Sequence, residues 1–290
     1  FFVMSTFEIR QSSITTKINY FMKNYILAMT ILVVFSACKQ NNAKPETIET
    51  SEETVGVVEV EKTKYPENLT KVFDAHGGID AWKSMKSIAF TMEKPDGKEV
   101  TTTNLNSREA LIESPNANIG FDGSKAWFLN KTEGDYQGYE PLYYYNLMFY
   151  FYAMPFVLSD DGINYAEAEP LVFEGVTYPG IQITYNVGVG ETPEDRYVLY
   201  YNPTTYQMEW LGYTVSFVPG IDKKELHFRR YDNWQKVNGL LLPKTIVGYG
   251  FKDDKPTEAK KSTEFIDVQV TDKEIESSKF AKPEKGEFVN

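Results

Sequence analysis

The segment Pro141–Leu158, PLYYYNLMFYFYAMPFVL, holds eight aromatic rings and no charged side chain in eighteen residues. The whole chain around it is acidic, with a formal net charge of −11. Three interpretations compete for the segment: a membrane span, an ordinary core element, or the wall of a site for an apolar ligand. A span needs about 20 mainly apolar residues. Here Pro155 interrupts the run and five tyrosines add hydroxyls that would need partners in lipid, so the composition disfavours a span.

The apolar side chains of this segment recur at helical spacing along two stripes. The first stripe contains Leu142, Tyr145, Phe149, Tyr152 and Phe156, and the second contains Leu147, Phe151 and Met154, with Tyr150 beside it. We predict a helix over residues 142–153 that ends near Pro155, because a proline disfavours helical backbone in the residue before it. A helix that is apolar all round is buried all round. Aromatic stripes are usually core, but one side of this helix could equally face a ligand.

The N-terminal region has the layout of an export signal. Residues 1–21 begin with Phe and fit no part of that layout, so we interpret them as non-native upstream sequence. Residues 22–37 place Lys23 before an eleven-residue apolar run and end in small residues, as a secretory signal peptide does. Cys38, the single cysteine of the chain, follows at once and resembles the lipidated cysteine of bacterial lipoproteins. An uncleaved anchor, or a chance cysteine after a signal, would give the same pattern.

The rest of the chain divides into a tether and one domain. After Cys38, the segment to residue 64 has no aromatic residue and is rich in Glu, Thr and Lys, which is typical of a flexible linker. Residues 65–290 begin with a helical pattern, continue with about five short strands, then the aromatic segment and about seven more strands. Without helices between them, these strands predict a mainly β protein of the α+β class. Its single large antiparallel sheet is expected to curve, because sheets of more than about ten strands rarely stay flat.

Several stretches resemble a known superfamily, in the same order along the chain. They are HGGIDAWKSMKSIAF (76–90), FDGSKAWFLN (121–130), YVLYYNPTTYQMEWL (197–211), YDNWQKVNGLLLPKTI (231–246) and IESSKFAKP (275–283). Together they resemble the periplasmic carriers that include LolA, LolB, RseB and LppX-type lipoproteins, and most of all an uncharacterised branch of Gram-negative lipoproteins. The resemblance implies an incomplete β-barrel wrapped around helices, with a hydrophobic cavity for acyl chains.

Within that architecture the aromatic helix would lie on the concave face of the sheet and share a cavity with inward-facing strand residues. The expected ligand-binding residues are Tyr145, Phe149, Tyr152, Phe156, Phe128, Tyr185 and Trp210. The opposite interpretation, in which both sides of the helix are filled core, predicts that these residues touch only protein. Which interpretation holds depends on whether the interior is open.

The residues needed for common catalytic and metal chemistry are scarce. The chain has two histidines, one cysteine that lipidation would block, and no G-x-S-x-G motif. We therefore expect no catalytic residue, no metal and no cofactor. His76 is expected to pack at a helix end beside Gly77, and His227 to lie at the surface or at a cavity mouth. The acid excess and the lack of a basic run argue against nucleic acid as a partner.

These observations predict a lipid-anchored protein of the cell envelope, at the outer membrane and facing the periplasm. It would contact the membrane through Cys38 and bind a hydrophobic ligand, a lipid or a lipoprotein acyl chain. One alternative is a module that docks another envelope protein and has a filled core. Another is a hydrolase, since the many carboxylates allow accidental acid pairs.

We expect Cys38→Ser to leave the protein exported but free of the membrane, because the thiol is the site to which the diacylglycerol would be joined. Sedimentation with envelope fractions before and after a high-salt wash measures the attachment, and Asn41→Ser, outside the motif, serves as the control. A Cys38→Ser protein that still sediments after the wash would contradict the lipidation.

Overall fold

The computed structural model describes residues 64–188, 194–217, 220 and 222–289. The expected signal peptide, Cys38 and nearly all of the expected tether lie outside these residues. Within the described part of the chain, no helix is long and apolar enough to cross a membrane.

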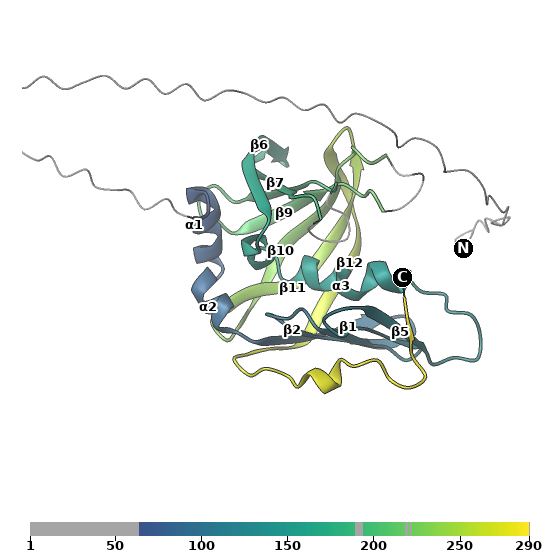
Figure 1. The fold of residues 1–290 in the computed structure, drawn as a ribbon. Helices are drawn as coiled ribbons and strands as arrows, with labels where there is room; N and C mark the ends of the chain where they lie inside the picture. The colour runs from purple at the N-terminus through teal and green to yellow at the C-terminus, as the bar shows by residue number, and fades with distance from the viewer. Residues whose placement is uncertain (1–63, 189–193, 218–219, 221, 290) are drawn as a thin grey trace, which may run out of the picture. The chain divides into compact units, whose positions relative to one another are not determined.

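The described chain forms one large antiparallel sheet of thirteen strands in the order β13-β5-β4-β3-β2-β1-β12-β11-β10-β9-β8-β7-β6. The strands are β1 Ser87–Lys94, β2 Gly97–Asn104, β3 Ala110–Glu113, β4 Ala117–Phe121, β5 Ala126–Asn130, β6 Ile163–Phe173, β7 Val176–Tyr185, β8 Tyr197–Tyr201, β9 Met208–Tyr213, β10 His227–Val237, β11 Leu240–Lys252, β12 Lys255–Thr271 and β13 Glu287–Phe288. The sheet curves strongly and stays open rather than closing into a barrel (Figure 1). The predicted mainly β fold with a curved antiparallel sheet is confirmed.

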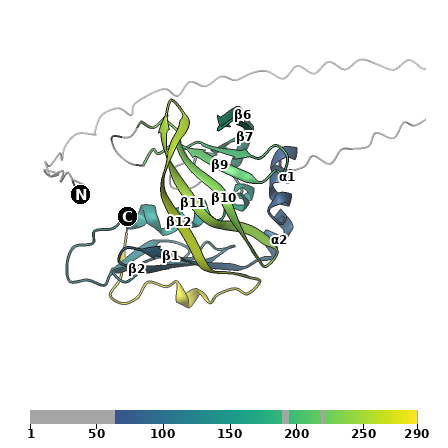
Figure 2. The ribbon, with the colours of Figure 1, turned by 180° about the vertical axis from the view of Figure 1, so that it is seen from behind.

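The long central strands join the two halves of the sheet (Figure 2). Strand β12 pairs with β1 on one side and with β11 on the other, and both pairings contain register shifts. Such irregularities bend a strand and increase its local twist. The register of β10 with β11 is set by a tight turn at Asn238-Gly239, where both residues have positive φ and Val237 pairs with Leu240.

Three α-helices and two short 3-10 helices accompany the sheet. They are α1 Glu67–Ala75, α2 Ile79–Ser84, α3 Pro141–Tyr152, η1 Phe156–Ser159 and η2 Ser277–Lys279. Helix α3 confirms the helix predicted over 142–153. The Glu140 side chain caps its start by accepting hydrogen bonds from the backbone N–H groups of Leu142 (3.1 Å) and Tyr143 (2.9 Å). Pro141 suits the first helical position, where its missing N–H costs nothing.

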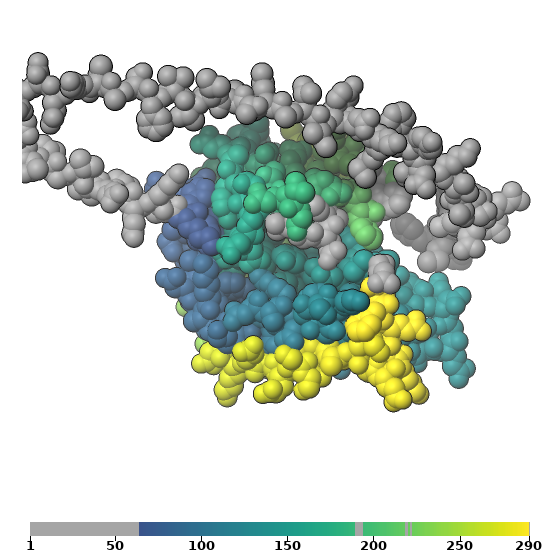
Figure 3. All heavy atoms as spheres, viewed as in Figure 1, coloured from purple at the N-terminus to yellow at the C-terminus, as the bar shows by residue number. Residues whose placement is uncertain are grey.

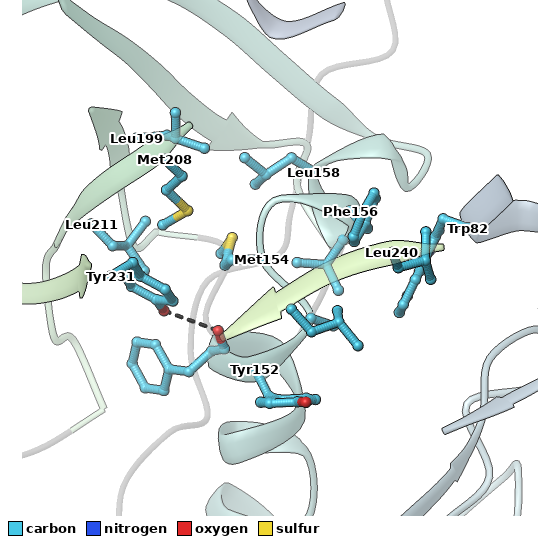
Figure 4. Close-up of a cluster of buried hydrophobic side chains, with 14 of the residues drawn as sticks. Trp82, Tyr152, Met154, Phe156, Leu158, Leu199, Met208, Leu211, Tyr231 and Leu240 are labelled. Atoms are coloured by element: carbon cyan, nitrogen blue, oxygen red, sulfur yellow. Dashed lines mark hydrogen bonds between the residues drawn. The ribbon is translucent and has the colours of Figure 1, made fainter. Parts of the chain in front are cut away.

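Helix α3 lies between the two halves of the sheet (Figure 1). Aromatic side chains bury it from several directions. Tyr152 packs against Phe90 and Phe265, with ring centroids 4.4 and 4.5 Å apart. On the side of β10, the Tyr231 hydroxyl donates a hydrogen bond to the Phe151 carbonyl oxygen at 2.9 Å (Figure 4). The C-terminal end of the helix is therefore held by both halves of the sheet.

The N-terminal end of α3 is held by a polar contact as well as by packing. The buried Tyr144 hydroxyl donates to Glu99 Oε1 on β2 at 2.7 Å, and Lys94 Nζ lies 3.1 Å from the same hydroxyl. Tyr145 stacks on Phe121 of β4 at 5.0 Å. These contacts fix the rotation of the helix about its axis.

The main core also joins the N-terminal helices to the segment after α3. Trp82 of α2 stacks on Phe156 of η1 at 4.9 Å (Figure 4). His76 follows the last turn of α1, as expected, and is fully buried with Nδ1 2.7 Å from the Val72 carbonyl oxygen. Burial lowers the pKa of His76 to about 4, so the ring is neutral at physiological pH.

A second apolar cluster occupies the opposite face of strands β7–β10. Its buried residues are Leu171, Tyr178, Val198, Tyr200, Trp210, Leu226 and Phe228. Trp210 was expected to face the same space as α3, but its neighbour Leu211 takes the inward position, and successive side chains of a strand point to opposite faces. Phe173, next to the tip of the β6–β7 hairpin, covers Trp210 at 4.8 Å.

The C-terminal segment covers the outer face of β3–β5 (Figure 3). After β12 the chain runs along this face, where Phe280 packs against Leu111 and Trp127. The Trp127 indole N–H donates to the Phe280 carbonyl oxygen at 2.8 Å. Strand β13 then pairs with β5 at the edge of the sheet.

A substitution at Phe149 tests how completely α3 is packed on the side that faces the main core. Its side chain is 3% exposed and belongs to the main core, so Phe149→Ala should lower the free energy of unfolding by about 3–5 kcal/mol through lost burial and a residual cavity. Urea denaturation followed by circular dichroism measures the loss. Val187→Ala, at a fully exposed position, should leave the unfolding midpoint unchanged. An equal midpoint for Phe149→Ala and the parent would show that this side of α3 is not core.

Candidate functional site

The side of α3 that faces β6–β9 leaves a cavity of about 130 Å³. One wall is formed by Tyr143, Leu147 and Tyr150 of α3, together with Val157 of η1. The facing wall comes from the ends of β6–β9 and from the segment that follows β9. The cavity is partly open to solvent, so a ligand could enter without unfolding the domain.

Tyrosines dominate the strand wall. Tyr185, Tyr197 and Tyr213 lie on the neighbouring strands β7, β8 and β9. Tyr197 pairs with Tyr213 of β9 and with Ile183 of β7, which points to the same side as Tyr185. Tyr197 contacts Tyr185 edge-on at 5.8 Å and stacks on Tyr213 at 6.3 Å. Burial raises the pKa of Tyr185 and of Tyr197, so both hydroxyls stay protonated at neutral pH.

The segment after β9 closes one side of the cavity. Thr214 and Val215 line it directly. The exposed Phe217 ring stacks on Tyr143 of α3 at 4.5 Å, which ties this segment to the helix.

Three carboxylates lie at the cavity, and each has a different environment. Asp160 accepts two hydrogen bonds of 2.6 Å from Arg108 Nη2, and the Arg108 guanidinium also lies 5.1 Å from the Phe149 ring. Burial raises the pKa of Asp160, while the charge of Arg108 opposes that rise. Asp161 is exposed and pairs with Lys64 at 2.9 Å.

The third carboxylate, Asp195, is buried. Its Oδ1 accepts hydrogen bonds from Thr214 Oγ1 at 3.1 Å and from the Ser216 backbone N–H at 2.8 Å. Both donors belong to the segment after β9, so Asp195 also fixes the wall that this segment forms.

The structure places the seven predicted ligand-binding residues in four different surroundings. Tyr185 lines the cavity. Phe149, Tyr152 and Phe156 lie in the main core. Tyr145 and Phe128 share the cluster between α3 and β3–β5, and Trp210 lies in the cluster on the opposite face of the sheet.

Sequence reasoning missed several residues that line the cavity. They are Tyr143, Tyr150, Tyr197, Tyr213 and Asp195. The period-two pattern of YVLYY in β8 could have identified Tyr197 as facing the same side as Leu199. The helix gave no comparable signal, because its two apolar stripes look equally suited to a core or to a cavity.

His227 of β10 lies close to this region without lining it. Its ring is half-buried, 5.7 Å from Tyr213 and 4.2 Å from Phe251. Burial lowers the pKa of His227. Across residues 64–289, in the described positions, no group of three or more His, Cys, Asp or Glu side chains is arranged to hold a metal ion.

A wider hollow of about 510 Å³ lies between α1 and β6–β8. Its wall includes Glu67, Asn68, Lys71 and Glu167, and it is more open than the tyrosine-lined cavity. Because half of its surface is polar, it suits water better than an apolar ligand.

Comparisons with known proteins concern the family and the fold. No curated protein matches the sequence. The model of a family of unknown function, DUF6503, matches residues 138–255, which include α3 and the strands that form the cavity.

Several solved structures are similar to the chain. A LolA superfamily protein from Nitrosomonas europaea is 10% identical over 68% of this chain and 88% of its own, with a TM-score of 0.42. A DUF1329 family protein from Desulfovibrio piger is 9% identical over 74% of this chain and 98% of its own, with a TM-score of 0.44. The lipoprotein LppX of Mycobacterium tuberculosis is 12% identical over 51% of this chain and 88% of its own, with a TM-score of 0.23. Two of these proteins, the LolA superfamily protein and LppX, belong to the group that the sequence resembles.

Breaking the ion pair between Arg108 and Asp160 should lower the free energy of unfolding by an amount that depends on pH. In Arg108→Met the half-buried Asp160 carboxylate loses its counter-ion, so its folded-state pKa rises further above the unfolded value. We expect a loss of about 1–3 kcal/mol at neutral pH. The loss should shrink as the pH falls through that raised pKa, towards about pH 4.5, because a protonated Asp160 no longer needs Arg108.

Urea unfolding of the variant and the parent at the two pH values measures this difference. Lys64→Met, which removes the exposed partner of Asp161, should leave the unfolding midpoint unchanged at both. A loss of equal size at both pH values would show that Arg108 acts through packing rather than through its charge.

Proposed function

We propose that this chain is a non-enzymatic binding protein of the cell envelope that holds an acyl chain or another narrow apolar ligand in the tyrosine-lined cavity. The observation that supports this most is the cavity itself, which is built between α3 and β6–β9 with the apolar side chains of Leu147, Val157 and Ile163 in its wall. A partly open apolar cavity with a few polar groups is the ordinary form of a small-molecule site.

The size of the cavity limits what can enter. Drug-sized ligands occupy pockets of about 300–1,000 Å³, whereas an engineered cavity of about 150 Å³ holds one benzene. A cavity of about 130 Å³ therefore accepts one segment of an alkyl chain, and the rest of the ligand would remain outside its mouth. The space on the other side of α3 is filled by the core, so we expect no deeper channel there.

The sequence supports an envelope location for this activity. The signal peptide at residues 22–37 and Cys38 are consistent with a lipoprotein anchored at the outer membrane and facing the periplasm. The linker that the composition of residues 39–64 predicts would let the domain reach a lipid or the acyl chain of a lipoprotein at the membrane surface.

A binding role fits the histidines better than catalysis does. His76 is neutral and enclosed by the main core, and His227 packs between aromatic rings outside the cavity wall. Neither ring borders the cavity in which a substrate would lie. A histidine that acts as general acid or base must lie within hydrogen-bond reach of the substrate.

A second candidate function is docking of another envelope protein on the edge of the sheet. Strand β6 is the last strand on its side. The tip of its hairpin exposes Val172 and Val176, whose side chains are 58% and 41% exposed. Edge strands of this kind can pair with a strand of a partner.

Filling the cavity tests the proposed ligand site. Val215→Trp places a large ring at a half-buried wall position and should weaken binding of a fluorescent fatty-acyl probe about tenfold or more. The matched control Val187→Trp makes the same change at a fully exposed position outside the cavity and should bind like the parent. Probe fluorescence titrated with each protein gives the dissociation constants.

Two results would contradict the cavity as the site. If both tryptophan variants bind the probe as the parent does, the acyl chain lies elsewhere. If the parent itself binds no probe, the docking function becomes the better explanation of the fold.

A further inference from the structure

The charges at the cavity wall are all of one sign. The lining residues include Asp160, Asp161 and Asp195 and no lysine or arginine. Asp160 is already paired with Arg108, and Asp161 with Lys64. Asp195 has no ion pair within the described part of the chain, although it is the most deeply buried of the three.

The environment of Asp195 leaves it able to bind one more group. Its side chain belongs to a residue that is 6% exposed, and both of its hydrogen bonds go to Oδ1. No donor among the described residues binds Oδ2, which can therefore accept a hydrogen bond from a molecule in the cavity. A buried carboxylate without a cation is costly, so a bound cation would be favoured at this position.

The surrounding tyrosines add to the attraction for a cation. Among the described residues, the hydroxyls of Tyr143, Tyr185, Tyr197 and Tyr213 make no hydrogen bond with protein, so their oxygens can accept from a ligand. The negative faces of aromatic rings also attract cations.

The Arg229 side chain, which lies outside the cavity wall, makes cation–π contacts with two of the lining rings. Its guanidinium lies 4.3 Å from the ring centroid of Phe151 and 5.6 Å from that of Tyr213, two rings that also line the cavity. The positive charge of Arg229 opposes a cation in the cavity. It is not part of the cavity wall, however, whereas Asp195 is, so a bound group would contact the carboxylate directly.

We infer that the ligand of the proposed binding function carries an alkylammonium group. The ammonium binds Asp195 Oδ2 and tyrosine hydroxyls, and the alkyl chain lies against Leu147, Val157 and Ile163. This inference rests on the proposed function and adds the chemical class of the ligand. It excludes a carboxylate or phosphate as the group nearest to Asp195, because two buried negative charges would repel each other.

Three probes with the same chain and different head groups test the inference: octylamine, octanol and octanoate. Isothermal titration calorimetry at neutral pH should give the order octylamine, octanol, octanoate from tightest to weakest. A hydrogen bond to a charged group is stronger than one between neutral groups, so octylamine should bind about tenfold more tightly than octanol.

Asp195→Asn should reduce the affinity for octylamine to that for octanol and leave octanol binding unchanged. The control Asp74→Asn removes the same charge from an exposed carboxylate outside the cavity and should keep the preference for the amine. If Asp195→Asn does not fold, Tyr197→Phe, which removes one hydroxyl from the wall, should still weaken octylamine binding and spare octanoate.

A further probe separates two sources of the ammonium. Nα-acetyl-lysine amide should bind more weakly than octylamine if the ligand is an amphiphile, and as tightly if it is a lysine side chain of another protein.

The ligand series on the parent protein distinguishes failure of this inference from failure of the proposed function. If octanol or octanoate binds as tightly as octylamine, the inferred ammonium group is contradicted, whereas the proposed apolar binding site is still supported. If none of the three probes binds and the fatty-acyl probe fails as well, the proposed function falls and this inference falls with it.

Discussion

The structure depends on one constraint: α3 is apolar around its whole circumference and has to be covered on every side. A single flat sheet can cover only one side of a helix. Here the sheet curves, with irregular pairing along β12, so that β1–β5 and β6–β11 contact the helix from different directions. Two hydrogen bonds, from Tyr231 to the Phe151 carbonyl and from Tyr144 to Glu99, then fix the helix against both halves.

The same constraint explains where the cavity lies. Phe149 and Tyr152 fill the space between α3 and the central strands, so no room remains there. On the side of β6–β9 the helix presents Tyr143, Leu147 and Tyr150, and the strands present tyrosines of similar length. Tyrosine suits this boundary because its ring can be buried while its hydroxyl needs a polar partner. The tyrosine rings of α3 and those of β7–β9 face each other across the cavity and leave a small space between them.

The electrostatics of the cavity separate it from the rest of the interior. The main core is mostly apolar and holds only a few polar atoms, such as His76 Nδ1, whereas three aspartates gather at the cavity. Arg108 neutralises Asp160 from the loop before β3, on the other half of the sheet, and Asp195 is bound by neutral donors alone. Under the proposed binding function, one buried carboxylate among apolar and aromatic side chains would select ligands by charge as well as by length.

The sequence by itself determined the element types and their order. Period-two patterns gave the strands, and the two stripes of Pro141–Leu158, ended by Pro155, gave the helix, because both patterns follow from local backbone geometry. Only the tertiary structure decided which stripe faces the cavity and which is core, since Phe149 and Tyr150 are both large aromatic residues and the rotation of α3 about its axis sets which one points to the core. The position of Trp210 was also decided by tertiary structure, because an alternating strand with large residues on both faces does not reveal which face is inside. Asp195 joins Tyr143 and Tyr185 through the curvature of the sheet, a long-range property that no short stretch of sequence contains.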